Sequence, residues 1–444
     1  MAPGARRAAS RHRLIQRKAA PRLAGTTCGM PVATSPDPVL IVGAGPAGLA
    51  LACALADAGL QVDVLEQQPL RALERPADDG REIALTHRSR RLMIRLGLWE
   101  RLPADEVALL REARVLDGDG DRPLRIRPPA HGDEPLGWLV ANRHIRAAAF
   151  GAARARAGVR VHADAPVAAL HLEPARAGVT LADGRRLDAA LVVASDSRFS
   201  PTRRLAGIGA STREFGRTAI LVPVDHERSN DGIAWECFGL DETLALLPMN
   251  GRRSSVVLTV SSGRASAWLA LSDADFAARI AARLERLVGR LALAGPRHAY
   301  PLVGVHADRF VAHRFALVGD AAVGMHPVTA HGWNLGLHGV EVLARELGRA
   351  RAAGRDPGDP RALEAFERAH RRRTRPLYEG TNAVVSLFTD ARPGARIVRR
   401  LVLEASEGWP GVSGLVKSFI TRQLVDAGRD EPDTPHPMPL ETLP

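Results

Sequence analysis

The N-terminal part of the sequence alternates between the pattern of a buried strand and that of a helix. Residues 39–42, VLIV, are the apolar, β-branched run of a buried parallel strand, and LALACALADAG after them is a helical pattern ending at Gly59. The next segment, QVDVLE, alternates as a second strand and ends at Glu66. A strand, a turn, a helix and a strand in this order predict the start of a doubly wound α/β sheet.

Two later segments repeat the pattern of a short apolar strand that delivers an acidic residue. LVVA, at 191–194, leads to Asp196, and FALV, at 315–318, leads to Asp320. Ligands of a doubly wound sheet bind at the carboxyl ends of its strands. Strand ends near residues 43, 196 and 320 therefore predict one long ligand that touches all three.

The pattern changes between these two strands. Residues 206–303 contain short strands separated by turn signals, which predicts an antiparallel sheet, and an amphipathic helix is expected at about 273–288. From residue 355 the pattern is helical. The predicted fold class is α/β, with a Rossmann-like domain interrupted by an antiparallel-sheet domain and followed by a helical C-terminus.

The turn after the first strand has the spacing G-x-G-x-x-G. Gly43 permits the tight turn, Gly45 lets a pyrophosphate approach the backbone, and Gly48 lets helix and strand pack closely. The helix start offers free N–H groups to phosphate, and Glu66 can accept hydrogen bonds from a ribose. An acid at Glu66 argues against NADP at this site, but the motif does not choose between NAD and FAD.

The distribution of charge along the chain does not favour nucleic acid as a partner. The chain of 444 residues has a net charge of +12, yet seven basic residues lie in residues 1–29, which contain no acidic residue. No nucleic-acid-binding motif occurs, so nucleic acid is not expected as a partner. The basic segment resembles a transit peptide; we favour a poorly ordered extension, or a true start at Met30.

Cysteine and histidine spacings do not indicate a metal site. The three cysteines show no C-x-x-C spacing, which fits a reducing, cytoplasmic setting. His326, His331 and His338 lie five and seven residues apart, whereas ligands on one helix face need spacings of roughly three or four. We expect no metal.

Three segments together carry a specific resemblance. The GAGPAG turn with Glu66, the ASDSRFSPTRR segment and the VGDAAVGMHPVTAHGWNLGL segment resemble, in order and spacing, the single-component flavoprotein aromatic hydroxylases. Within them the sequence is most similar to the UbiM-type ubiquinone-biosynthesis hydroxylases. The resemblance runs from about Pro38 to about Asp390 and implies FAD as the cofactor.

The resemblance implies a role for several residues. Asp320 would hold the ribityl chain of FAD, Arg81 would lie near the pyrophosphate, and Asn142 near the FAD backbone. Asp196, at its strand end, is also expected to contact the cofactor.

Residues after Asp320 would form a wall against the flavin. Pro327, with the histidine before it, would flank the isoalloxazine, and Gly332 and Asn334 would present backbone and helix start to its pyrimidine edge. Two positions depart from the general family, Asp196-Ser197 in place of Asp-Gly and His331 in place of Gln. Both agree with the UbiM-type subgroup.

The resemblance implies an FAD-dependent monooxygenase that hydroxylates a polyprenyl phenol or quinol in ubiquinone biosynthesis. Reduced flavin would add O2 at C4a, and the electron-rich ring would attack the distal oxygen. NAD(P)H or another donor would supply electrons. The proton acceptor is His331 or water. Two alternatives stay open, a flavin-dependent reductase on the same scaffold and a non-catalytic FAD-bound scaffold subunit.

The substrate side is expected in the antiparallel sheet. Candidate pocket residues are Trp235, Phe238, Leu246 and Pro248; the alternative for each is ordinary sheet core.

The expected organisation is a basic extension, an FAD-binding domain in three pieces, a substrate domain in two, and a tail. Their bounds are 1–37; 38–100, 136–205 and 304–390; 101–135 and 206–303; and 391–444. An apolar stripe with cationic flanks at 412–424 suits either a membrane surface or packing on the protein itself. We therefore expect a cytoplasmic protein with peripheral contact to the membrane and to other quinone-biosynthesis proteins.

Overall fold

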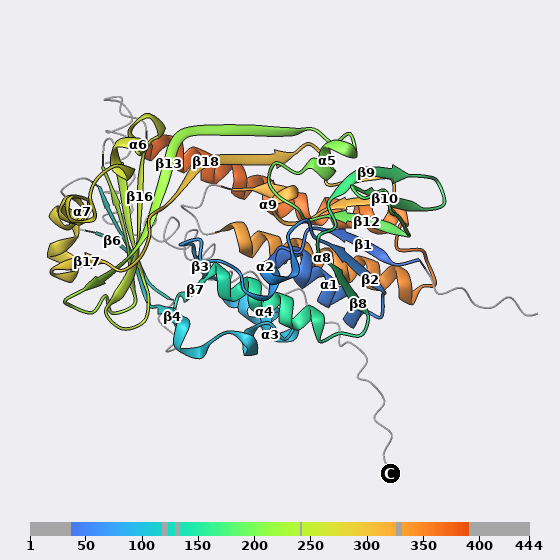
Figure 1. The fold of residues 1–444 in the computed structure, drawn as a ribbon, viewed down its shortest axis with the longest axis horizontal. Coiled ribbons are helices and arrows are strands. Elements are labelled where there is room, and N and C mark those ends of the chain that lie inside the picture. Colours follow the sequence, from blue (N-terminus) through green and yellow to red (C-terminus); the bar gives the residue numbers. More distant parts are fainter. Residues whose placement is uncertain (1–36, 118–122, 129–133, 240–241, 326–330, 390–444) are drawn as a thin grey trace, which may run out of the picture. The chain divides into compact units, whose positions relative to one another are not determined.

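The predicted parallel sheet is present in the structure, a computed structural model that describes residues 37–117, 123–128, 134–239, 242–325 and 331–389. Its strand order is β19-β20-β12-β1-β2-β8, with β1 parallel to both β2 and β12 and with β12 parallel to β20 (Figure 1). The strands are β1 (Val39–Val42), β2 (Val62–Leu65), β8 (Val159–His162), β12 (Leu191–Ala194), β19 (Val311–Ala312) and β20 (Phe315–Leu317).

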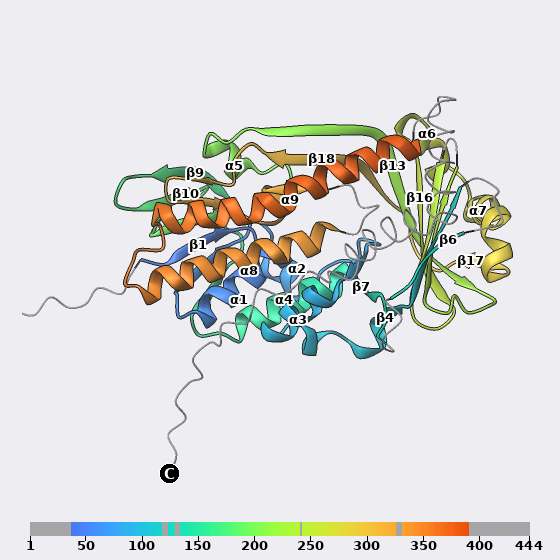
Figure 2. The same cartoon turned by 180° about the vertical axis from the view of Figure 1, so that it is seen from behind.

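Helices cover one face of this sheet, and a small antiparallel sheet covers the other (Figures 1 and 2). The helices of this layer are α1 (Pro46–Asp57), α4 (Asn142–Arg154), α8 (His331–Ala352) and α9 (Pro360–Thr389). The small sheet is β9 (Val167–Leu172), β10 (Ala177–Leu181) and β11 (Arg186–Ala189), and Gly184, at φ 87°, lies in the turn between β10 and β11. This three-layer arrangement is the predicted Rossmann-like domain.

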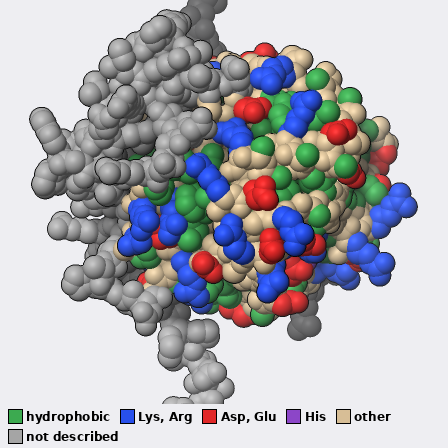
Figure 3. Space-filling view, turned by 90° about the vertical axis from the view of Figure 1, so that its left-hand side faces the viewer, with side chains coloured by type: hydrophobic (Ala, Val, Ile, Leu, Met, Phe, Trp, Pro, Cys, Tyr) green, Lys and Arg blue, Asp and Glu red, His purple; other side chains and the backbone are tan. Residues whose placement is uncertain are grey.

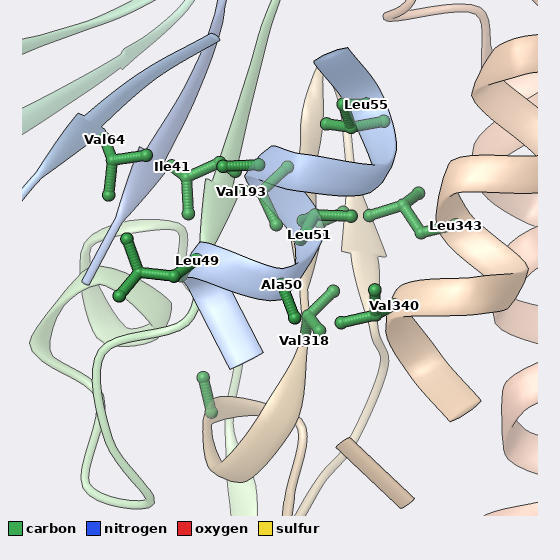
Figure 4. Packing of buried hydrophobic residues seen from close by; sticks show 14 of the residues in the cluster. Ile41, Leu49, Ala50, Leu51, Leu55, Val64, Val193, Val318, Val340 and Leu343 are labelled. Carbon is green, nitrogen blue, oxygen red and sulfur yellow. The ribbon is translucent and has the colours of Figure 1, made fainter. Parts of the chain in front are cut away.

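The core of the domain lies between the strands, α1 and α8. Figure 4 shows Leu51 and Leu55 of α1 beside Leu343 of α8, and Ile41 with Val193 from the neighbouring strands β1 and β12. Strands buried on both faces are apolar at every position, and for this reason VLIV and LVVA could be predicted as strands from the sequence.

The middle of the chain forms the predicted antiparallel-type sheet, with strand order β21-β18-β13-β16-β15-β14-β5-β6 and β17 paired to β13. β14 pairs with β5 in parallel, so an earlier segment of the chain completes this sheet. The strands are β5 (Glu112–Asp117), β6 (Leu124–Ile126), β13 (Ala210–His226), β14 (Ile233–Phe238), β15 (Glu242–Pro248), β16 (Arg253–Ser261), β17 (Leu291–Leu293), β18 (His298–Ala307) and β21 (Val323–Gly324).

Helices α6 (Ser262–Leu269) and α7 (Asp273–Val288) cover one face of this large sheet, and α7 confirms the amphipathic helix expected at 273–288. Ser272 caps α7 by accepting the Asp275 N–H, and Gly289 ends it at φ 75°. The apolar stripe of α7 is fully buried, whereas the side of the molecule beyond α7 carries interspersed basic and acidic side chains (Figure 3).

A second small sheet, of order β3-β7-β4, packs against the other face of the large sheet. Its strands are β3 (Glu82–Leu85), β4 (Val107–Leu110) and β7 (Gly137–Ala141). Ala84 and Leu139 from the small sheet share a cluster with Ala234 and Val115 from the large one. The large sheet is therefore covered on both faces, by helices on one and by β3-β7-β4 on the other.

Phe276 tests the packing of α7 on the large sheet. Its side chain has no exposed surface and meets Trp268 edge-on at 5.4 Å between ring centroids. Phe276→Ala should lower the free energy of unfolding by about 3–5 kcal/mol, because it removes a buried ring and leaves a cavity. Denaturant unfolding measures this loss. Leu269→Ala, at a side chain that is 38% exposed, should stay within about 1 kcal/mol of the parent.

Candidate functional site

The ends of β1 and β12 approach each other at backbone distance. A Cβ built on Gly43 would lie 2.5 Å from the Ser195 carbonyl oxygen and 2.8 Å from the Asp196 Cα, and Gly43 has φ 109°. Only glycine fits this conformation and this contact. Two of the three predicted strand ends therefore meet here, as expected from their pairing in the sheet.

The other two glycines of the motif differ in what limits them. A Cβ on Gly48 would lie 2.1 Å from the Gly43 carbonyl oxygen, so the protein itself requires glycine there. A Cβ on Gly45 would come no closer than 4.0 Å to the Ser195 carbonyl oxygen. Gly45 begins α1 without a side-chain cap, so its side faces space left open for a ligand, with unpaired N–H groups beside it.

Glu66 lies beside this turn, at the end of β2. Its two carboxylate oxygens accept the N–H groups of Ala44 at 2.8 Å and Gln68 at 2.9 Å. These bonds fix the carboxylate next to the glycine turn. The remaining lone pairs are suited to hydroxyl donors.

The third strand end brings Asp320 to the same place. β20 leads into a 3-10 turn, η3 (Gly319–Ala321), and a Cβ on Gly319 would lie 3.0 Å from the Ala47 Cβ of α1. The Asp320 carboxylate is 40% exposed and forms an ion pair with Arg198 at 3.0 Å. Arg198 also donates to the Val303 carbonyl at 3.0 Å, so it joins η3 to β18 of the large sheet.

Arg81 belongs to a polar cluster that includes Asn142. The Asp79 carboxylate accepts from Arg81 Nε at 2.9 Å and from Asn142 Nδ2 at 2.7 Å, and the Asp79 carbonyl accepts from the Tyr300 hydroxyl at 2.8 Å. Burial alone would raise the pKa of Asp79, but the bonds and charge of Arg81 outweigh it and the pKa lies below its usual value. Asp320 contributes to the raised pKa of Arg81, so these charges act on one region.

The start of α8 is joined to β3. Asn334 Nδ2 donates to the Ala84 carbonyl at 2.9 Å, and its Oδ1 accepts the Thr86 N–H at 3.2 Å. Its side chain therefore holds backbone in place, which leaves its own backbone for the role expected at a flavin edge. A Cβ on Gly332 would meet no atom within 4 Å.

Two predicted residues of this segment are not fully described. Pro327 lies outside the described residues, as does the 412–424 stripe. His331 is the first residue of α8, but its side chain lies outside the described part.

Several buried polar atoms around these strand ends lack a hydrogen-bond partner within the described residues. They are Ser195 Oγ, Asp196 Oδ1 and Trp333 Nε1. A buried polar atom without a partner costs free energy, so atoms of this kind beside an open glycine turn are what a polar ligand would satisfy.

The substrate candidates divide between the two faces of the large sheet. Trp235 pairs with Leu246, and both pack in the cluster beneath α7, where Leu246 has no exposed surface. Leu246 is thus a core residue of the helix-covered face, and Pro248 shares its parity along β15. Phe238 has the opposite parity to Trp235 and is 7% exposed.

The fold and this convergence of strand ends and helix starts define a dinucleotide-binding flavoprotein architecture. The chain belongs to the FAD binding domain family, which matches residues 37–379. It is 42% identical over 390 residues to a ubiquinone hydroxylase, UbiM, of Neisseria meningitidis, covering 87% of this chain and 84% of the relative. It is 38% identical to a ubiquinone hydroxylase, UbiL, of Rhodospirillum rubrum, covering 92% and 94%.

Solved structures show the same fold at lower identity. The p-nitrophenol 4-monooxygenase PnpA of Pseudomonas putida aligns with a TM-score of 0.71 at 19% identity, over 89% of this chain and 99% of that one. The expected FAD-dependent monooxygenase class and its α/β fold are confirmed.

The described residues fit FAD. The open side of Gly45, the uncapped start of α1 and the unpartnered Asp196 Oδ1 are suited to a diphosphate and its neighbouring hydroxyls.

Within the described helices, none combines the length and apolarity needed to cross a bilayer.

Sequence reasoning missed three members of the site, Asp79, Arg198 and Tyr300. Arg198 lies in the quoted ASDSRFS segment, so its place after a strand end was a usable signal. The bond from Tyr300 to Asp79 joins residues far apart in the chain, and no local pattern indicates it.

Gly45 and Gly48 offer a matched pair of tests. Gly45→Ala should leave the free energy of unfolding within about 1 kcal/mol of the parent, because its Cβ meets open space. The same variant should bind FAD at least about tenfold more weakly. Gly48→Ala should destabilise the apoprotein by about 3 kcal/mol or more, because its Cβ overlaps the Gly43 carbonyl. Thermal unfolding and FAD titration measure both. Unchanged FAD affinity in Gly45→Ala would contradict this placement.

Proposed function

We propose that this chain hydroxylates the aromatic ring of a polyprenyl phenol or quinol intermediate of ubiquinone biosynthesis. The observation that carries the proposal is 42% identity, over 87% of the chain, to a protein named a ubiquinone hydroxylase. A second relative so named, at 38% identity over 92% of the chain, supports the same substrate class.

We propose that the converging strand ends hold the cofactor. Glu66 accepts the ribose hydroxyls, Gly43, Gly45 and Gly48 with the start of α1 hold the diphosphate, and Asp320 binds the ribityl chain. The other proposed cofactor contacts are Arg81, Asn142, Asp196, Pro327, Gly332 and Asn334.

FAD, when bound, supplies reduction of O2 and transfer of one oxygen atom to the ring. One NAD(P)H, or an equivalent two-electron donor, one proton, one O2 and the substrate give NAD(P)+ or the oxidised donor, the hydroxylated ring and one water. The protein's residues orient the substrate ring, exclude bulk water and hold the proton that leaves the ring hydroxyl.

We further propose peripheral contact with the membrane that holds the polyprenyl substrate, and contact with other quinone-biosynthesis proteins.

Asp320→Ala should reduce FAD affinity by about 10-fold to 100-fold, because a charged acceptor for the ribityl hydroxyls is lost. Equilibrium dialysis of apoprotein with FAD measures it. Asp183→Ala, in the exposed hairpin between β10 and β11, serves as a control and should bind FAD as the parent does. Equal affinity in the two variants would refute the role of Asp320.

Reaction under isotopically labelled O2 tests the chemistry. One labelled oxygen atom should enter the ring of the quinol product for each turnover, while labelled water should contribute none. Mass spectrometry of the product measures both. A product without label would instead indicate reductase chemistry on this scaffold.

A further inference from the structure

Glu236 lies on the face of the large sheet that α6 and α7 do not cover. Along β14, Trp235 packs in the cluster beneath α7, and the N–H groups of Arg283, in α7, donate to the Cys237 carbonyl at 3.4 Å. Successive side chains of a strand point to opposite faces. Glu236 therefore points away from α7. The small sheet β3-β7-β4 lies on that side of the large sheet (Figure 1).

The neighbours of Glu236 on this face are apolar. Val115 on β5 and Ala245 on β15 lie directly opposite it, and Ala245 pairs in turn with Val257 on β16. Among the described residues, nothing forms a hydrogen bond or an ion pair with the Glu236 side chain.

This face is tied to the segment that carries Arg81 and to the start of α8. The same row of paired residues ends at His298, whose ring a Cβ on Gly80 would approach to 2.6 Å. At the other side, Ala234 shares a cluster with Ala84, the residue whose carbonyl is bound by Asn334. Glu236 thus faces the elements that are proposed to hold the flavin.

Glu236 is partly exposed to solvent. Burial nevertheless raises its pKa to about 8, with no charge among the described residues contributing. The titratable groups that share or cover this face are Glu82 on β3, Arg217 and Asp225 on β13, Arg253 on β16, and His298 and Tyr300 on β18. Asp225 and Arg253 form an ion pair with each other at 2.7 Å. A carboxyl kept this poorly solvated and unpaired is typical of a site where a proton is transferred.

We propose that the Glu236 carboxylate accepts the proton of the substrate's ring hydroxyl. This inference rests on the proposed ring hydroxylation. The O–H bond breaks, its electron pair stays on oxygen as phenolate, and the proton forms the O–H bond of the Glu236 carboxylic acid. The phenolate makes the ring more electron-rich for oxygen transfer, and the acid returns the proton to the product oxygen at the end.

The test uses FAD-loaded Glu236→Gln, which keeps the shape of the side chain and removes its ionisation. In the parent, kcat/KM should rise about tenfold from pH 7 to pH 9, because the carboxylate form increases through a pKa near 8. The variant should lose this rise and be about 100-fold to 10,000-fold slower at pH 9, with FAD content unchanged.

Glu242→Gln is the matched control. Glu242 lies one strand away on β15, shares the parity of Leu246 beneath α7, and is 3.7 Å from Arg283. It should keep the parent's rate and pH profile. Equal pH profiles in the parent and Glu236→Gln would overturn the inference, whereas a parent that inserts no labelled oxygen would overturn the proposed function itself.

The melting temperature reports on Glu236 without turnover. The folded pKa near 8 exceeds the ordinary value of 4.5, so ionisation of the unfolded chain weakens the parent between these pH values. Glu236→Gln should therefore match the parent's melting temperature at pH 4 and exceed it at pH 8. A variant that is unfolded, or less stable at pH 8, would also overturn the inference.

Discussion

The contact between the first turn of α1 and the end of β1 is the constraint on which the rest of this structure depends. Because a Cβ on Gly48 would lie 2.1 Å from the Gly43 carbonyl, the helix can start at this place only while both positions remain glycine. The close approach of Gly43 to Ser195 then fixes β12 beside β1. Arg198 extends the arrangement to Asp320 and to β18, so one backbone contact sets the position of the site and of the sheet beside it.

Most of the fold was predictable because its strongest signals are local. VLIV and LVVA are buried on both faces, and α7 repeats its apolar residues at helical spacing between a serine cap and a glycine end. The strand ends at Gly43, Asp196 and Asp320 were also predictable, because parallel strands carry their carboxyl ends to one edge.

The sequence did not indicate which residues of the large sheet point to which of its two faces. Both of its faces are covered, one by α7 and one by β3-β7-β4, so both sets of alternating residues are mostly apolar. Trp235 and Leu246 were predicted as pocket residues because they are large and apolar, but both pack beneath α7. The less conspicuous alternate set, with Ala234, Glu236 and Phe238, faces the side on which β3-β7-β4 packs. Contacts such as that of Asn334 with Ala84 join distant segments, which no local pattern reveals.

The carboxyl groups around the site differ in whether a hydrogen-bond donor or a positive charge stabilises their negative charge. Asp79 is bound by Arg81 and Asn142, Asp320 by Arg198, and Glu66 by two backbone N–H groups. The pKa of Asp79 lies below its usual value because of its bonds to Arg81 and Asn142, and carboxylates bonded in this way suit the binding of hydroxyls. Glu236 alone among these four has no such partner within the described chain, and its desolvation costs the folded state stability above pH 4.5. Since packing would be satisfied as well by an apolar residue in that row, the cost is explained by a reaction that needs a base there.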